Sequence, residues 1–278
     1  MHDRSRPTRP ARRSNTHWCS GVSAERLLHG VGARSQRAAT NSSVKIATRV
    51  AALDWRGIEN DLNAHGAALT GALLTPDECD ALIGIYSRPE IFRSRVVMQR
   101  HGFGQGEYQY FAYPLPPIVA RMRSALYPPL ARVANEWQAA LGTEERFPER
   151  HEDYIAHCHR HGQTRPTPLL LRYGEGDYNC LHQDIYGEQV FPLQATILLG
   201  EPGIDFTGGE FVLTEQRPRR QSRVEVVPLR RGEAVIFAVR QRPVRGARGY
   251  YRVNLRHGVS RVLTGERLTC GIIFHDAA

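Results

Sequence analysis

Three residues suited to binding a metal ion are the most informative feature of this chain. His182 and Asp184 lie two positions apart, and His257 follows much later. Two imidazoles and one carboxylate can occupy one face of an octahedral metal ion and leave three positions open, which is the ligand set of a mononuclear iron(II) oxygenase. The pattern His-x-Asp alone is weak evidence, because the chain contains 12 histidines and short motifs match by chance.

The neighbouring segments predict a β scaffold that brings the three residues together. On an extended strand, His182 and Asp184 would point to the same face, and His257 would come from an adjacent strand. Short apolar segments separated by turn signals favour a sandwich or barrel over βαβ units. The predicted strands cover residues 167–173, 191–199, 208–213, 223–229, 233–238, 256–262 and 267–274.

The region before these strands is predicted to be mainly helical. Thr75-Pro76-Asp77-Glu78 is a capping box with proline at the first helical position, so a helix should begin there and run to about residue 87. Residues 117–127 and 129–141 predict two helices broken at Pro128-Pro129, because proline disrupts a helix interior. We expect these helices to support the outside of the larger sheet.

The order of the segments resembles the 2-oxoglutarate- and iron(II)-dependent oxygenase superfamily over about residues 165–276. This resemblance implies a mainly β fold with flanking helices: a double-stranded β-helix, or jelly roll, with the metal between its sheets and an N-terminal helical buttress. The motifs that carry it are Arg172-Tyr173-x-x-Gly176-Asp177-Tyr178, His182-x-Asp184, Gly208-Gly209-Glu210-Phe211, Arg231-Gly232-Glu233-Ala234-Val235-Ile236-Phe237 and His257-Gly-Val-x-x-Val262-x-x-Gly265-x-Arg267-x-Thr269.

Residues 46–278 are most similar to a bacterial group named as oxygenases for oxidative removal of alkyl groups from damaged nucleic acid. The runs 248–260 and 271–277 carry this closer match. The resemblance implies iron(II), 2-oxoglutarate as co-substrate and O2, with His182, Asp184 and His257 as metal ligands and catalytic centre. The implied reaction hydroxylates a C–H bond and releases succinate and CO2. On an N-methyl group it would end in formaldehyde and a repaired base.

The far carboxylate of 2-oxoglutarate requires a cation. The chain has one lysine, Lys45, which lies upstream of the predicted domain, so an arginine must serve, and its planar fork suits a carboxylate. The resemblance assigns this role to Arg267, with Thr269 and Tyr173 as further hydroxyl donors. Arg261 is the alternative anchor, and Tyr173 could equally be a packed strand aromatic.

Two other functions remain open at this level. An enzyme with the same chemistry could hydroxylate a protein side chain or a small metabolite instead of performing DNA repair. A chain of a different class would be a non-catalytic jelly-roll module that only binds a metal. The pocket is built from loops, so the sequence does not settle the substrate.

An arginine-rich stretch just before His257 is the predicted contact for alkylated DNA or RNA. Arginines suit phosphates, and tyrosines suit base stacking, although a solvated loop is an equal alternative. The arginine-rich stretch contains Arg240, Arg242, Arg245, Arg248, Tyr250, Tyr251 and Arg252.

Two further segments have alternative roles. The aromatic run 107–114 could line the wall of the substrate pocket or pack in the core. Four histidines, His151, His157, His159 and His161, are predicted to lie in a solvated or lid loop.

Composition divides the chain into residues 1–45, a basic tail that we expect to be disordered, and residues 46–278, the oxygenase domain. The tail has nine basic and two acidic residues, a net +7 of the chain's +9, and could alternatively be a nucleic-acid arm. Within the domain, residues 46–164 are expected to be mainly helical support and 165–278 the jelly-roll core. No signal-like or membrane-spanning run occurs, and five scattered cysteines favour reduced thiols in the cytoplasm. The oligomeric state is not predicted.

Overall fold

The computed structural model describes residues 46–278. The predictions for the basic tail at residues 1–45 lie outside the described residues. Residues 46–50 are helical and lead into the domain. Among residues 46–278, no helix has both the length and the apolar character that crossing a bilayer requires.

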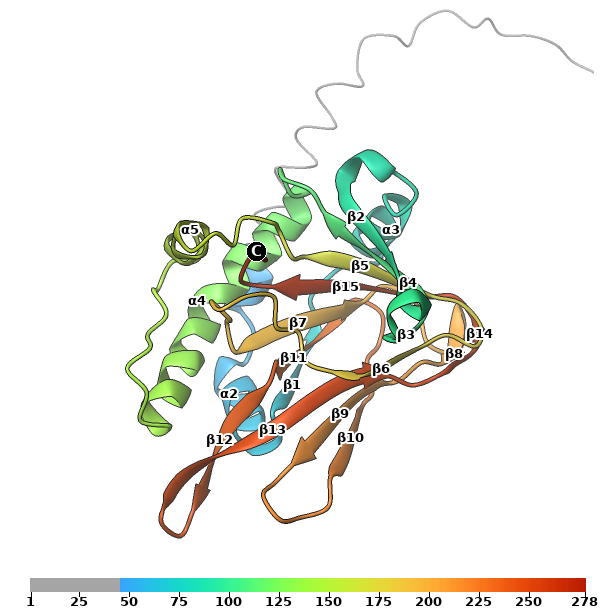
Figure 1. Cartoon of the computed structure of the whole chain (residues 1–278). Coiled ribbons are helices and arrows are strands. Elements are labelled where there is room, and N and C mark those ends of the chain that lie inside the picture. Colours follow the sequence, from blue (N-terminus) through green and yellow to red (C-terminus); the bar gives the residue numbers. More distant parts are fainter. Residues whose placement is uncertain (1–45) are drawn as a thin grey trace, which may run out of the picture. The chain divides into compact units, whose positions relative to one another are not determined.

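Two antiparallel sheets form the framework of the domain (Figure 1). The larger sheet has the order β1 (Ala67–Ala72), β11 (Glu233–Ala238), β7 (Leu193–Leu198), β15 (Arg267–Ile273), β5 (Leu169–Tyr173), β4 (Glu107–Phe111) and β2 (Phe92–Val97). The smaller sheet has the order β10 (Arg223–Val227), β9 (Phe211–Gln216), β13 (Gly249–Val259), β6 (Tyr178–His182) and β3 (Gly104–Gln105), with β12 (Gln241–Gly246) paired to β13. Separately, β8 (Phe206–Gly208) pairs with β14 (Val262–Gly265).

The chain path confirms the predicted jelly roll. From β5 onward the strands pass repeatedly between the sheets: β5, β7, β11 and β15 belong to the larger one, and β6, β9, β10 and β13 to the smaller one. Eight strands divided in this way between two sheets form the double-sheet jelly roll. Strands near each other in space therefore come from distant parts of the sequence, as the metal triad requires.

Burial explains why these segments form strands. Along β9, Phe211, Leu213 and Glu215 are buried while the residues between them are partly exposed, the period-2 pattern of a strand with one covered face. Every residue of β15 is buried, because β15 is central in the larger sheet. Between the sheets, the Phe237 ring lies 4.8 Å from that of Phe211 and 4.6 Å from that of His257, so the core extends up to the predicted metal ligand.

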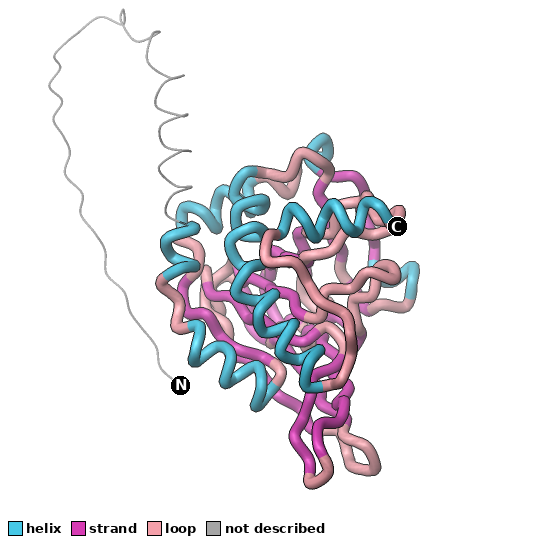
Figure 2. Tube along the Cα trace, turned by 90° about the vertical axis from the view of Figure 1, so that its left-hand side faces the viewer, coloured by secondary structure: helices cyan, strands magenta, loops and turns pink. Residues whose placement is uncertain are grey.

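Helices cover the outer side of the larger sheet, as predicted (Figure 2). Arg123 ties α4 (Pro117–Ala140) to β15, because its Nε donates to the Ile273 carbonyl at 2.7 Å. The capping box of Thr75 and Glu78 is confirmed at the start of α3 (Pro76–Gly84). The elements are α2 (Trp55–His65), α3 (Pro76–Gly84), α4 (Pro117–Ala140), α5 (His151–Arg160) and the 3₁₀ turns η1 (Pro89–Ile91) and η2 (Met98–His101).

Two predictions for residues 46–164 were wrong or incomplete. The helix α4 continues through Pro128 and Pro129, so the predicted break does not occur. Buried residues on both sides of the prolines, including Leu126, Leu130 and Trp137, hold the two halves in one line, and this packing outweighs the roughly 3 kcal/mol cost of an interior proline. In addition, the segment contributes β1 to β4 to the sheets, so it is not only helical support.

The predicted lid loop around the histidine cluster is instead the helix α5. His151 is buried, and its Nε2 forms a hydrogen bond with the Phe274 carbonyl at 2.9 Å. His159 bonds Asp276 at 2.8 Å, and His157 bonds Gln189 at 2.8 Å. These contacts give the cluster a packing role.

Candidate active site

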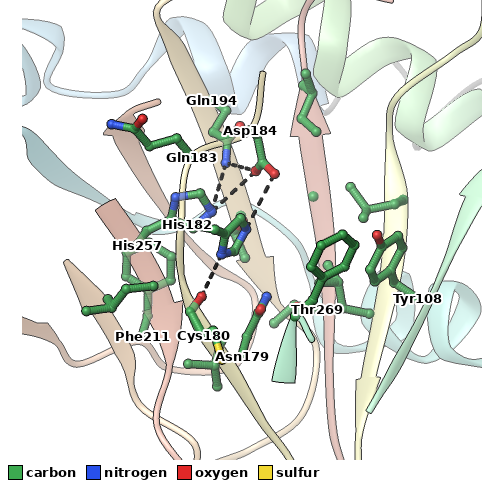
Figure 3. A pocket seen from close by; sticks show the side chains of 18 of the residues that line it. Tyr108, Asn179, Cys180, His182, Gln183, Asp184, Gln194, Phe211, His257 and Thr269 are labelled. Carbon is green, nitrogen blue, oxygen red and sulfur yellow. Dashed lines mark hydrogen bonds and ion pairs between the residues drawn. The ribbon is translucent and has the colours of Figure 1, made fainter. Parts of the chain in front are cut away.

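The three predicted metal ligands come together at one point between the sheets. One side-chain ligand atom from each of His182, Asp184 and His257 lies within 4.8 Å of the other two. Asp184 stands between the imidazoles: Oδ1 is 3.4 Å from His182 Nε2, and Oδ2 is 3.3 Å from His257 Nε2 (Figure 3). In the described part of the chain, this is the one cluster of histidine, cysteine and acidic side chains with such spacing.

Strand register explains how the ligands meet. His182 ends β6 and is the cross-strand partner of His257 on β13, so both side chains leave the sheet on the same face. Asp184 is not on the strand as expected; it lies two residues beyond the end of β6. Its carboxylate nevertheless faces both histidines (Figure 3).

Neighbouring groups fix the orientation of two ligands. His182 Nδ1 lies 2.8 Å from the Cys180 carbonyl, and donation of the Nδ1 proton there leaves the Nε2 lone pair for a metal. The amide of Gln194 donates to Asp184 Oδ2 at 2.7 Å. The hydroxyl of Tyr186 donates to Asp184 Oδ1 at 2.6 Å.

The protonation states suit a metal centre. Burial alone would raise the pKa of Asp184, but hydrogen bonds and charge from His182 and His257 hold that pKa well below its ordinary value. Burial, together with the charge of His182, lowers the pKa of His257. An ionised carboxylate beside a neutral imidazole is the form in which these groups bind iron(II).

A cavity of about 420 Å³ opens onto the triad and also contains the three predicted 2-oxoglutarate contacts, Arg267, Thr269 and Tyr173. Arg267 and Thr269 stand two residues apart on β15 and are each 1% exposed. Tyr173 is fully buried, and its hydroxyl accepts a hydrogen bond from Asn179 at 3.3 Å. Arg261, the alternative anchor, is exposed and does not line this cavity.

The guanidinium of Arg267 has unsatisfied hydrogen-bonding groups. Its Nε and Nη1 are buried and have no hydrogen-bond partner, and burial lowers the pKa of Arg267 to about 10, which leaves it charged at neutral pH. The rings of Tyr173 and Phe206 lie 5.6 and 5.9 Å from it. A buried cation of this kind is costly unless an anion joins it, so the residues fit a carboxylate ligand.

Gly209 makes room for this arginine. It has a φ of 64°, and a Cβ there would lie 2.8 Å from Arg267 Cδ. The backbone at Gly209 therefore approaches the Arg267 side chain more closely than a residue with a Cβ could.

The arginine-rich stretch divides into buried and exposed members. Arg242 is 1% exposed and its Nη2 forms an ion pair with Glu215, so it is a structural residue and not a phosphate contact. Arg252, Arg248 and Tyr250 are exposed, on or next to the β12–β13 hairpin. None of the seven residues of this stretch lines the metal cavity.

The aromatic run 107–114 divides between the cavity and the core. Tyr108 lines the metal cavity, whereas Phe111 is fully buried in the core. The sequence interpretation missed Gln194 and Tyr186. A single glutamine in the otherwise apolar segment 191–199 was an available signal, because a buried amide needs polar partners.

The triad, the arginine beside it and the jelly roll define an iron(II)- and 2-oxoglutarate-dependent oxygenase, which uses dioxygen. A family model described as "Oxygenase, catalysing oxidative methylation of damaged DNA" matches residues 106–277. This match covers more than half of the chain, and the chain belongs to that family.

The chain is similar to known proteins at two levels. The uncharacterized proteins MT2286 and Rv2227 of Mycobacterium tuberculosis are each 51% identical over 168 residues, which cover 60% of this chain and 72% of the relative. An oxidoreductase of the 2OG-Fe(II) oxygenase family from Burkholderia pseudomallei is 16% identical with a TM-score of 0.46, covering 81% of this chain and 92% of that one. A Trichoplax adhaerens prolyl hydroxylase, solved with a hypoxia inducible factor peptide fragment, is 12% identical with a TM-score of 0.49, covering 87% and 92%.

Proposed function

We propose that this enzyme removes alkyl groups from damaged nucleic-acid bases by hydroxylating the carbon attached to nitrogen. The description of the family, oxidative chemistry on damaged DNA, supports this substrate class. The observation that carries the catalytic part is the pairing of a three-ligand metal site with a buried, unpartnered Arg267 in one cavity.

Each side chain has a task in this proposal. His182, Asp184 and His257 hold the iron, and Gln194 and Tyr186 keep the Asp184 carboxylate aimed at it. Bound iron(II) supplies the activation of dioxygen, with 2-oxoglutarate as the source of two electrons, for oxidation of a C–H bond.

The co-substrate lies between the triad and β15 in this proposal. Arg267 binds the far carboxylate of 2-oxoglutarate through its free Nε and Nη groups, and the Thr269 hydroxyl donates to the same carboxylate. Apolar cavity walls, including Leu171 and Phe211, exclude water from the reacting carbon.

Formaldehyde release from an oligonucleotide with a single N-methylated base tests the substrate. The complete protein with iron(II), 2-oxoglutarate and air should form formaldehyde and succinate in equal amounts. Asp184→Ala should form neither. Succinate formation that no methylated oligonucleotide stimulates, but that a peptide or small metabolite does, would reassign the substrate and keep the oxygenase.

A further inference from the structure

Exposed apolar side chains gather at the mouth of the metal cavity. Phe103, Leu181 and Ile185 are 48%, 46% and 43% exposed, and all three line the cavity that holds the triad. We call these three residues the apolar rim. Exposed apolar groups that converge on a site mark a binding surface, whereas isolated ones need no explanation.

The rim is attached directly to the metal site. Leu181 immediately precedes His182, and Ile185 immediately follows Asp184. Any substrate that reaches the triad therefore lies against side chains whose neighbours in sequence bind the metal. A substitution in the apolar rim should therefore change substrate binding.

Phe103 is exposed although its backbone is held firmly. Its carbonyl accepts from the Cys180 amide at 2.9 Å, and its own amide donates to the Met98 carbonyl at 3.2 Å. The next residue, Gly104, has a φ of 128°, and a Cβ there would lie 2.3 Å from the Tyr178 carbonyl. The turn thus lies against β6 and holds the phenyl ring at the cavity mouth.

A second ring supports the first. The His101 imidazole stacks on Phe103 with ring centroids 5.3 Å apart and planes 22° from parallel. A stacked pair of flat rings is a suitable platform for a third flat ring, and aromatic residues bind nucleobases of any sequence in this way.

The size of the cavity restricts what enters. A cavity of about 420 Å³ is within the size range of pockets that bind one small ligand, and part of this one lies at the metal triad. Enzymes that act on a base in nucleic acid take that base out of the stack.

We propose that Phe103, supported by His101, is the stacking platform for a single unpaired base, and that Leu181 and Ile185 complete the apolar rim beside it. This inference rests on the proposed function and adds the residue that recognises the substrate. Phe103 acts on binding, and His182, Asp184 and His257 act on the reaction.

Binding of a labelled single-stranded oligonucleotide tests the platform. Fluorescence anisotropy is measured under anaerobic conditions with the complete protein, iron(II) and 2-oxoglutarate. Two probes are compared: one carries a central N-methylated base, and the other lacks the base at that position. The wild-type protein should bind the first about 5- to 150-fold more tightly, the range for one stacked base.

Variants at Phe103 separate stacking from simple apolar contact. Phe103→Ala and Phe103→Leu should both bind the two probes alike, and Phe103→Trp should restore the preference. Ile204→Ala removes a side chain that is 82% exposed and outside the cavity, so it should behave as wild type.

Each contrary outcome has one meaning. A wild-type preference in Phe103→Leu would overturn stacking, and a wild-type preference in Phe103→Ala would overturn the platform altogether. If Phe103→Ala loses nothing while the wild-type protein releases formaldehyde from the methylated oligonucleotide, the platform fails and the proposed function stands. If the wild-type protein neither binds nor demethylates any oligonucleotide, both fail.

Discussion

Two buried arginines of the domain, one on α4 and one on β15, differ in the groups that surround them. Arg123 on α4 is 2% exposed, and it donates to the Asp276 carboxylate at 2.7 Å and to the carbonyls of Ile273 and His275. Arg267 on β15 is 1% exposed, and its Nε and Nη1 have no partner. The first cation is satisfied by the protein, whereas the second is not.

The difference separates structural from functional burial. A buried cation stabilises a fold only when fixed partners balance the loss of water. Arg123 meets that condition and joins α4 to the end of the chain. Arg267 does not, and it stands in the same cavity as the metal triad. A ligand that supplies an anion is the simplest explanation of its position.

The largest expected effect is the loss of iron(II) binding and turnover in a variant that keeps its fold. Asp184→Ala should abolish iron(II) binding and turnover, because it deletes the ligand between the two histidines. The weak visible band of the iron–2-oxoglutarate chelate, titrated anaerobically, measures this, and the melting temperature without iron should stay near that of the wild-type protein. A chelate band of normal intensity in the variant would contradict the assignment of Asp184.

The next largest effect should be the loss of stability on replacing Arg123, whose charge is balanced by protein groups. Arg123→Ala should lower the free energy of unfolding by about 3–5 kcal/mol, because the buried Asp276 loses its charge partner. Urea unfolding without 2-oxoglutarate provides the value. Arg267→Ala is the matched control and should cost far less under the same conditions, since it breaks no hydrogen bond to the protein. Equal losses in the two variants would remove the distinction between them.

The same Arg267→Ala variant should have a strong effect on co-substrate binding. Loss of charge-assisted hydrogen bonds worth about 1.5–3 kcal/mol corresponds to a roughly 10- to 150-fold higher 2-oxoglutarate requirement. Titration of succinate formation against 2-oxoglutarate measures it. Arg261→Ala, on the exposed side of the strand connection, should leave the requirement unchanged. The reverse result would transfer the anchor role to Arg261.

The smallest effect concerns pH and the region around Arg123. Burial, and then the charge of Arg123, lowers the pKa of His151 to about 3, whereas an unfolded histidine titrates near pH 6.5. Below about pH 6.5, His151 binds a proton in the unfolded chain but not in the folded one. The free energy of unfolding therefore falls as the pH falls. This contribution approaches about 1.4 kcal/mol per pH unit once the pH is well below 6.5, and it continues down to the folded pKa.

Urea unfolding at pH 6.5 and pH 5.5 tests this contribution. His151→Gln should reduce the loss of stability between the two pH values by about 1 kcal/mol, while His65→Gln, at an exposed position of α2, should leave it as in the wild-type protein. An unchanged slope in His151→Gln would mean that the buried imidazole is protonated in the folded state.

The catalytic half of the fold could be predicted from sequence because its signals are local or strictly ordered. His182, Asp184 and His257 occur in a fixed order among the other motifs of the chain. The strands around them are apolar runs that lie between turn residues. The continuous α4 could not be predicted, since packing of Trp137 and its neighbours overrides the local preference of Pro128-Pro129.

The details of the site depend on tertiary contacts that no spacing reveals. Tyr186 and Gln194 reach Asp184 from different segments. Phe103 arrives at the cavity mouth only because its backbone pairs with Cys180. The roles of Arg267 and Thr269 remain predictions, although the structure places both beside the triad.

The unsatisfied guanidinium of Arg267 also predicts that 2-oxoglutarate affects the stability of the fold. A ligand that binds only the folded protein raises its stability by RT ln(1 + [L]/Kd), about 2.7 kcal/mol when the ligand is present at 100 times its Kd. When 2-oxoglutarate supplies the missing anion, the melting temperature rises with its concentration. If Arg267 is the anchor, the enzyme without this dicarboxylate should be both inactive and less resistant to unfolding than the enzyme that binds it.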